Sequence, residues 1–302
     1  MNKRIAWDKM KEKRIESKIS RTAEYTCMTR AASFCEKTPQ YKSNDYIAPK
    51  LLPKFFIPVI KIGMFRKFFT NRFPAGMYEY VISRTKFIDS VFQKSIFNEF
   101  DQILIFGAGF DSRGIRFGDL NKKTKIFELD APVTQEAKIN QLKKREIELN
   151  PNVIFISIDF NKESLEDKLI EFGFQKNKRS LFILEGLTMY LDPEAIDSTF
   201  HVIDQFAGTG SEIVFDYVYS SVLRGENIYY GESEVINQVN DANEPWSFGI
   251  EKGDLESFLN DKNLKLICSL NSDDLEDKFF KNEHGTIIAK VNGTHCITYA
   301  RK

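Results

Sequence analysis

The chain has 302 residues, which is enough for one large domain or two small ones with a sizeable core. Basic and acidic residues are balanced at 43 each, so no net charge would attract nucleic acid or an anionic membrane. Charged residues make up 28% and hydrophobic residues 42% of the chain, proportions typical of a soluble globular protein.

The first hundred residues predict a mostly helical cap. Residues 1–36 contain few helix breakers and carry apolar residues at helical spacing, and Met77–Phe97 repeats that pattern. The proline-rich stretch from Pro39 to Pro74 predicts short helices or irregular structure between them. No apolar run follows the charged N-terminus, so we expect no secretion signal.

Cysteines and histidines are too scattered to predict a disulfide framework or a metal site. No two of the four cysteines form a CxxC pair, and the three histidines are widely separated. Together with the missing signal peptide, this pattern favours a cytoplasmic protein with reduced thiols and no bound metal. The sequence carries no indication of the oligomeric state.

The segment from Leu51 to Phe69, LLPKFFIPVIKIGMFRKFF, is the one stretch that suggests a membrane. Two prolines and four basic residues interrupt it, so we expect no stable membrane insertion. It could lie on a membrane surface or cover the mouth of a pocket, and we favour the pocket.

From Gln102 onward, strand-like and helix-like segments alternate, which predicts a doubly wound α/β sheet. We expect a single domain over residues 1–302, with the cap at 1–100, the sheet at 101–302 and a lid at about 220–250, where a long polar connection breaks the alternation. The expected strands are Gln102–Phe106, Lys125–Asp130, Val153–Phe160, Ser180–Leu187, Glu212–Tyr219, 264–270 and 294–300, and the expected helices are Pro132–Leu149, Ser164–Gly173, Pro193–Ala207 and Glu251–Asn260.

A Gly-x-Gly turn follows the first expected strand. Gly107 and Gly109 permit a tight turn and let backbone N–H groups approach a ligand. Asp130 ends the next strand about twenty residues later, where an acid can hold ribose hydroxyls. Ser112 stands where the dinucleotide fingerprint has its third glycine, which counts against NAD. A nucleoside cofactor without a pyrophosphate, such as S-adenosylmethionine, needs no such glycine.

Acids or glycines also stand at the next strand ends. Asp159-Phe160 closes the third expected strand, and Glu185-Gly186 stands in the end of the fourth. Ligands of an open α/β sheet lie outside the carboxyl ends of its strands. The set offers what an adenosyl ligand requires: hydrogen-bond acceptors, an apolar face for the ring, and close backbone approach.

The motifs FGAGFDSR, FELDAPVTQEAK, ISIDF and LEGLTMYL resemble the successive motifs of the leucine carboxyl methyltransferase family. SRTAEYTCMTRAAS and ISRTKFID are similar too, so the resemblance extends from about residue 20 to residue 219. It implies a class I methyltransferase fold with a seven-stranded sheet and S-adenosylmethionine as cofactor. The family methylates carboxylates and includes tetracenomycin-type polyketide O-methyltransferases.

Carried over by position, the resemblance implies a cofactor site. Gly107 would approach the methionine part of S-adenosylmethionine, and Asp130 would hold the ribose. Asp159 and Phe160 would border the adenine, and Glu185 would line the site near the reacting end.

Two arginines are implied as partners of the cofactor. Arg84, in ISRTKFID, matches an arginine that pairs with the cofactor's carboxylate. Eukaryotic members of the family place a lysine in the N-terminal segment, but TCMTRAAS contains none, so Arg30 is a candidate replacement. The alternative for Arg30 is a solvated helix face.

Further side chains are predicted to face the methyl acceptor. Arg113 and Arg116 could orient a carboxylate bidentately, or they could lie on the surface. Tyr190 is expected to line the reacting end with Glu185, and Tyr190 and Tyr217 to contact the substrate.

The predicted reaction is methyl transfer to a carboxylate of a small molecule or polyketide-like acid. A carboxylate is ionised at neutral pH and needs no general base, and no His–acid pair stands out in the sequence. The alternatives are methylation of a protein C-terminus, an NAD(P)-dependent oxidoreductase on a similar sheet, and a binding protein without turnover.

Overall fold

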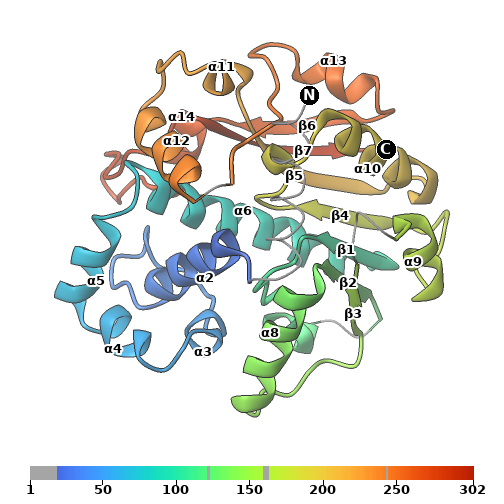
Figure 1. Cartoon of the computed structure of the whole chain (residues 1–302), viewed down its shortest axis with the longest axis horizontal. Coiled ribbons are helices and arrows are strands. Elements are labelled where there is room, and N and C mark those ends of the chain that lie inside the picture. The colour runs from blue at the N-terminus through green and yellow to red at the C-terminus, as the bar shows by residue number, and fades with distance from the viewer. Residues whose placement is uncertain (1–18, 121–122, 159–162, 243) are drawn as a thin grey trace, which may run out of the picture.

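The computed structural model describes residues 19–120, 123–158, 163–242 and 244–302. Within these residues, seven strands form one sheet in the order β3-β2-β1-β4-β5-β7-β6 (Figure 1). Strand β7 runs antiparallel to both of its neighbours, and the other pairings are parallel. The strands are β1 (Gln102–Phe106), β2 (Lys125–Asp130), β3 (Val153–Ser157), β4 (Ser180–Leu184), β5 (Glu212–Val218), β6 (Lys265–Leu270) and β7 (His295–Arg301).

Helices cover both faces of the sheet because the central strands are apolar on both sides. Every residue of β1, β4 and β5 is buried. One face packs Ile103, Ile126 and Ile183 against α6 (Met77–Phe97), α8 (Pro132–Lys144) and α14 (Ser272–Phe279). The other face packs Leu104 and Phe127 against α9 (Leu165–Glu171), α10 (Pro193–Phe206) and α13 (Leu255–Asn260).

Among the described residues, four helices precede α6 and form the cap: α2 (Arg21–Phe34), α3 (Ala48–Leu51), α4 (Phe56–Lys61) and α5 (Gly63–Thr70). Helix α2 begins where the Ser20 side chain accepts a hydrogen bond from the backbone N–H of Ala23 at 3.2 Å. In Figure 1, α2 lies beside α6, and α3, α4 and α5 lie along the outer edge of the cap.

The expected lid contains two helices, α11 (Ser220–Leu223) and α12 (Glu232–Asp241). The chain after α12 returns across the short 3₁₀ helix η2 (Thr188–Tyr190), where the backbone N–H of Ser247 donates to the carbonyl of Met189 at 2.8 Å. The segment therefore rests on the carboxyl end of β4.

Most expected elements form, with shorter ends. The extents of β1, β2 and α6 agree with the sequence, whereas β4 ends at Leu184 and α8 ends at Lys144. Two short helical pieces, α7 (Arg113–Arg116) and η1 (Gly118–Leu120), follow the glycine turn, and α14 forms where no element was expected. Among the described residues, no helix is both long and apolar enough to cross a bilayer.

Candidate active site

The glycine turn after β1 lies against helix α2. Gly107 and Gly109 both have positive φ, at 57° and 49°. A Cβ on Gly109 would stand 2.9 Å from the Cβ of Ala23, closer than such atoms approach. The turn therefore needs glycine both for its backbone conformation and for its contact with the cap.

Asp130 faces this turn from the end of β2. Its carboxylate accepts hydrogen bonds from the backbone N–H of Gly109 and from that of Ala131, the latter at 2.6 Å. Burial raises the pKa of Asp130, and the two N–H donors act in the opposite direction. Among the described residues, each oxygen accepts one hydrogen bond and keeps a lone pair, so the ribose role predicted for Asp130 is chemically open to it. Asp159 and Phe160, predicted to border the adenine, lie outside the described residues.

Arg84 joins the ends of β4 and β5. Its Nε donates to Glu185 at 3.1 Å, and its Nη1 donates to Asp216 at 2.7 Å. Asp216 also accepts the backbone N–H of Gly186 at 2.6 Å and the hydroxyl of Tyr80 at 2.8 Å. A Cβ on Gly186 would lie 3.1 Å from Nη1 of Arg84. Glu185 thus supplies a carboxylate for Arg84, and Gly186, which has no side chain, leaves room for the Arg84 guanidinium.

Arg113 occupies the centre of the site. It is 1% exposed and donates to Glu185 at 2.7 Å, to Asp89 at 2.8 Å and to Asp111. Arg116 binds both oxygens of Asp89, at 2.7 and 2.8 Å. Both arginines are buried, which excludes the surface alternative. Their predicted contact with a substrate carboxylate stays a prediction, and the Nη2 of Arg113 is a buried donor without a hydrogen-bond partner among the described residues.

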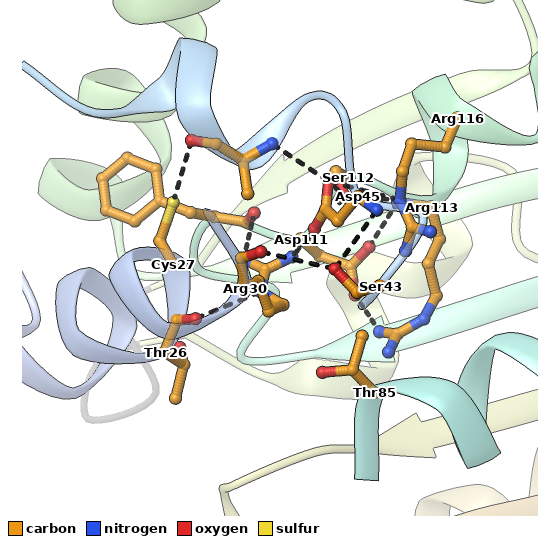
Figure 2. A network of polar contacts seen from close by, with 12 residues as sticks. Thr26, Cys27, Arg30, Ser43, Asp45, Thr85, Asp111, Ser112, Arg113 and Arg116 are labelled. Carbon is orange, nitrogen blue, oxygen red and sulfur yellow. Dashed lines mark hydrogen bonds and ion pairs between the residues drawn. The ribbon is translucent and has the colours of Figure 1, made fainter. Parts of the chain in front are cut away.

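Arg30 ties the cap to the glycine turn (Figure 2). Its Nη2 donates to the carbonyl of Phe110 at 2.7 Å and its Nη1 to Asp45 at 2.8 Å. Ser112, the residue that departs from the dinucleotide fingerprint, donates its hydroxyl to Asp45 at 2.8 Å and accepts the Nε of Arg116 at the same distance. Arg30 is therefore not on a solvated helix face, and its role toward the cofactor stays a prediction.

These side chains form one charged cluster, which we call the arginine–carboxylate cluster. Among the described residues it contains four guanidiniums and five carboxylates, a formal charge of −1: Arg30, Arg84, Arg113, Arg116, Asp45, Asp89, Asp111, Glu185 and Asp216.

The guanidiniums keep carboxylates of the cluster ionised. Burial alone would raise the pKa of Glu185, but Arg113 and Arg84 outweigh it and hold that pKa below its usual value. The same balance lowers the pKa of Asp111 to about 2, with Arg113 as its main partner. Carboxylates held in this state are weak proton acceptors at neutral pH.

Tyr190 marks the predicted reacting end. Its hydroxyl lies 3.4 Å from Oγ1 of Thr22, which donates to Glu244 at 2.6 Å. The Trp246 ring stands edge-on to Tyr190, with centroids 6.5 Å apart. The cap, η2 and the lid therefore meet here. Thr22 and Trp246 were not predicted; the similarity of SRTAEY to the family was the one signal for Thr22.

His295, the first residue of β7, lies beside Trp246 and was also not predicted as a site residue. Its ring lies 4.3 Å from that of Tyr80 and 5.1 Å from that of Trp246, between centroids. In antiparallel pairing it faces Val218, two residues after Asp216, so it lies on the same side of the sheet as Asp216.

The tautomer of His295 follows from its neighbours. The side-chain amide N–H of Asn292 donates to the carbonyl of Ala75 at 2.9 Å, so its oxygen is the atom that accepts the hydroxyl proton of Thr294 at 2.6 Å. Thr294 Oγ1 then has no proton left for Nδ1 of His295, 2.7 Å away, so Nδ1 must be the donor. Burial and Arg84 lower the pKa of His295 to about 3, which keeps the ring neutral.

Tyr217 lies elsewhere. It packs with Phe215 on β5 and with Tyr219 just after that strand, with ring centroids 6.2 Å apart in each pair. Successive strand residues alternate between faces, so Tyr217 points to the opposite side of the sheet from Asp216. The predicted contact with substrate has no support from this geometry, because the sheet separates Tyr217 from the arginine–carboxylate cluster. In the described part of the chain, no group of His, Cys, Asp and Glu is arranged to hold a metal ion.

Comparisons with known proteins agree with the predicted family and fold. The model of the leucine carboxyl methyltransferase family matches residues 26–204. YktD of Bacillus subtilis, named as a candidate S-adenosyl-L-methionine-dependent methyltransferase, is 26% identical over 264 residues, which cover 82% of this chain and 86% of YktD. A similarly named protein of Mycobacteroides abscessus is 32% identical over 155 residues, 48% of this chain and 50% of its own.

Two solved structures share the fold over nearly the whole chain. A DUF574 family protein from Streptomyces avermitilis has a TM-score of 0.58 at 10% identity and covers 96% of this chain and 100% of its own. A candidate methyltransferase from Thermobifida fusca has a TM-score of 0.55 at 12% identity and covers 91% of this chain and 94% of its own. The predicted fold class is confirmed.

Proposed function

Because the chain belongs to the leucine carboxyl methyltransferase family, we propose that it transfers a methyl group to a carboxylate oxygen of a small organic acid. The coarser activity is that of an S-adenosylmethionine-dependent methyltransferase, on which the family and the relatives agree. The predictions of family and cofactor are thereby confirmed. The carboxylate acceptor is the part that we propose.

The observation that carries this proposal is the state of three candidate bases in the described site, Glu185, Tyr190 and His295, each of which is a poor proton acceptor. Glu185 is held ionised by two arginines, and burial raises the pKa of the Tyr190 hydroxyl. His295 donates through Nδ1 to a hydroxyl instead of a carboxylate, and its pKa of about 3 makes its other ring nitrogen, Nε2, a weak base. A phenol or alcohol would need a base to lose its proton, whereas a carboxylate has already lost it.

The residues present fit the cofactor. Two glycines of positive φ free the turn for close approach, and Asp130 offers acceptor lone pairs at the next strand end. The arginine–carboxylate cluster has a formal charge of −1, which complements a cationic sulfonium. When bound, S-adenosylmethionine supplies an electrophilic methyl group on that sulfonium.

The chain's own contribution is to position the reactants and exclude water. Thr22 from the cap, Tyr190 from η2 and Trp246 from the lid come together over the end of β4. Two reactants held in line there would gain most of their rate from orientation and desolvation. We propose that Arg113, with its unpartnered Nη2, orients a carboxylate, either that of the acceptor or that of the cofactor.

The rival functions are less well supported. Ser112 is held in hydrogen bonds with Asp45 and Arg116, so the turn does not offer the third glycine that pyrophosphate binding favours. Methylation of a protein C-terminus uses the same carboxylate chemistry and differs only in the acceptor's size. We also propose the cytoplasm as the compartment, since the four cysteines form no disulfide in the described structure.

The test is transfer of labelled methyl from S-adenosylmethionine to matched panels of small acids, phenols, alcohols and peptides with free C-termini. We expect base-labile methyl esters of small acids, and a rate almost independent of pH between about 6 and 8, where such acids are ionised. Transfer to hydroxyl groups alone would refute the carboxylate acceptor.

A variant separates the two chemistries. His295→Asn keeps a donor to Thr294 and removes the Nε2 atom, so we expect the turnover rate to change by less than about threefold. A general base would lose roughly 10²–10⁴ in rate. A loss of that size in a folded His295→Asn protein would favour hydroxyl methylation.

A further inference from the structure

The outer edge of the cap combines exposed apolar side chains with unpaired positive charge. Residues 46–78 contain no Asp or Glu and six cations: Lys50, Lys54, Lys61, Arg66, Lys67 and Arg72. Only Arg66 forms an ion pair among the described residues, with Glu36 at 2.8 Å. The chain as a whole has no net charge, so this excess is local to one edge of the molecule.

Four large apolar side chains on this edge face solvent. Phe55 is 70% exposed, Ile62 47%, Met64 73% and Phe68 60%. Met64 and Phe68 are four residues apart on α5 and share one face of that helix. Such a group is unusual for a globular surface and marks a site of interaction.

Arg66 explains why α5 presents that face. It lies two residues from both Met64 and Phe68, so it points to the opposite side of the helix. It is buried, and donates to Glu36 and to the carbonyl of Ile60 at 2.9 Å. This inward anchor fixes Met64 and Phe68 outward. The Arg72 guanidinium lies over the Phe68 ring, 4.3 Å from its centroid, with charge and apolar surface side by side.

A basic cavity adjoins this edge. It has a volume of about 350 Å³ and lies between the α3–α4 connection and the end of α8, lined by Pro53, Lys54, Gln141, Lys144 and Arg145. Arg145 is fixed by a 3.0 Å hydrogen bond to the carbonyl of Leu52. Lys54 precedes the exposed Phe55, so the cavity and the apolar side chains are continuous along the chain. No carboxylate lines the cavity.

We propose that this edge, α4 and α5 with the adjoining basic cavity, is a docking surface for a membrane containing anionic phospholipids. The cavity receives a phosphate headgroup, and Phe55, Met64 and Phe68 enter the boundary between headgroups and acyl chains. The cations at the rim meet the negative surface, each contributing about fivefold to the partition coefficient. The protein lies on the bilayer and does not cross it.

The positive charge of this edge, together with its exposed apolar side chains, distinguishes among three possible partners: a second copy of the chain, nucleic acid and a membrane. Two copies of this edge placed face to face would bring the five exposed cations of each chain together, which opposes self-association. Nucleic acid would satisfy the charges and leave the exposed Met64 and Phe68 without an apolar partner. A bilayer with anionic headgroups satisfies both. The pocket-cover role favoured by the sequence does not explain why these four side chains face solvent.

The test is flotation of the full-length protein with vesicles of phosphatidylcholine alone or mixed with phosphatidylglycerol. We expect binding to the mixed vesicles and at least tenfold weaker binding to phosphatidylcholine alone. The double variant Met64→Ser, Phe68→Ser and the double variant Lys54→Ala, Lys144→Ala should each lower binding at least tenfold. Raising salt from about 0.1 to about 0.5 M should weaken binding of the wild type.

Matched controls use sites away from the edge. Phe97→Ser removes a side chain that is 86% exposed at the end of α6, and Lys252→Ala removes an exposed cation before α13; both should bind as the wild type does. Unchanged thermal midpoints and cofactor affinity would show that all variants are folded.

Three results would overturn the proposal. The first is equal binding to both kinds of vesicle, or to neither. The second is unchanged binding by both double variants, which would place the contact elsewhere. The third is self-association of the wild type without vesicles that Met64→Ser, Phe68→Ser abolishes, which would identify the edge as an interface between copies.

Discussion

Asp89 is predicted to be the structural centre of the arginine–carboxylate cluster. It accepts one bond from Arg113 at 2.8 Å and two from Arg116, at 2.7 and 2.8 Å, and all three side chains are nearly buried. Asp89→Asn preserves the shape and removes the charge. One oxygen becomes an N–H₂ group that faces a guanidinium, so at least one bond is lost and replaced by donor–donor repulsion.

The expected cost follows from these contacts. A hydrogen bond to a charged group contributes about 1.5–3 kcal/mol, and breaking a buried ion pair outright costs about 3–5 kcal/mol. Because one oxygen of the amide still accepts, we expect Asp89→Asn to lower the free energy of unfolding by about 2–4 kcal/mol. For a chain of 302 residues this corresponds to a decrease of roughly 3–6 °C in Tm.

The assay is urea unfolding, with thermal unfolding as a second measure. Asp197→Asn is the matched control, because Asp197 pairs with Lys262 at 2.5 Å but is 68% exposed. Exposed pairs contribute at most about 1 kcal/mol. If Asp89→Asn costs no more than Asp197→Asn, the reasoning that the cluster is a stabilising network is wrong.

Four further outcomes are expected. Asp130→Ala should cost about 1.5–3 kcal/mol of S-adenosylmethionine affinity by calorimetry, and unchanged affinity would rule out its ribose role. Arg84→Lys should weaken binding of S-adenosylhomocysteine more than that of methylthioadenosine, which lacks the carboxylate; equal losses would mean that Arg84 supports the fold alone. Methyl transfer should continue in the presence of EDTA. If EDTA abolished the activity and Mg²⁺ restored it, this prediction would be wrong. Burial would raise the pKa of Asp111, but Arg113 outweighs it and lowers that pKa to about 2. The ionised carboxylate should therefore add about 2 kcal/mol to the free energy of unfolding above pH 4, and this contribution should be lost as the pH falls toward 2. Urea unfolding at a series of pH values tests this, and a free energy of unfolding that does not change over this range would contradict it.

The sequence predicted the ends of those helices and strands that are set by neighbouring residues in the chain. The apolar run of β1 and the amphipathic α6 begin and end as the sequence indicates, because each is closed by glycine or by a change of pattern. Strand β4 was predicted three residues too long, to Leu187, whereas it ends at Leu184. The positive φ of Gly186, at 63°, and its hydrogen bond to Asp216 turn the chain there, and Asp216 is thirty residues away.

The sequence predicted site residues only where they belong to a recognisable motif. Asp130, Glu185 and Arg84 were singled out, and the structure brings the last two together. Asp45 and Asp216 were missed because nothing near them in the sequence marks them as partners of an arginine. His295 was missed because its tautomer depends on residues 292 and 294 and on Ala75, far away in the chain.

The wide spacing of the cluster along the chain bears on how the protein is made. Arg84 leaves the ribosome about 100 residues before Glu185, on the order of 10 s earlier at usual rates of synthesis. Its charge cannot be buried before Glu185 and Asp216 arrive, because a guanidinium without its carboxylates is costly to desolvate. The Arg84 side of α6 must therefore stay hydrated until β4 and β5 are made. Cofactor binding should then be among the last properties that the nascent chain acquires, and a chain that stalls before residue 216 should display none of it.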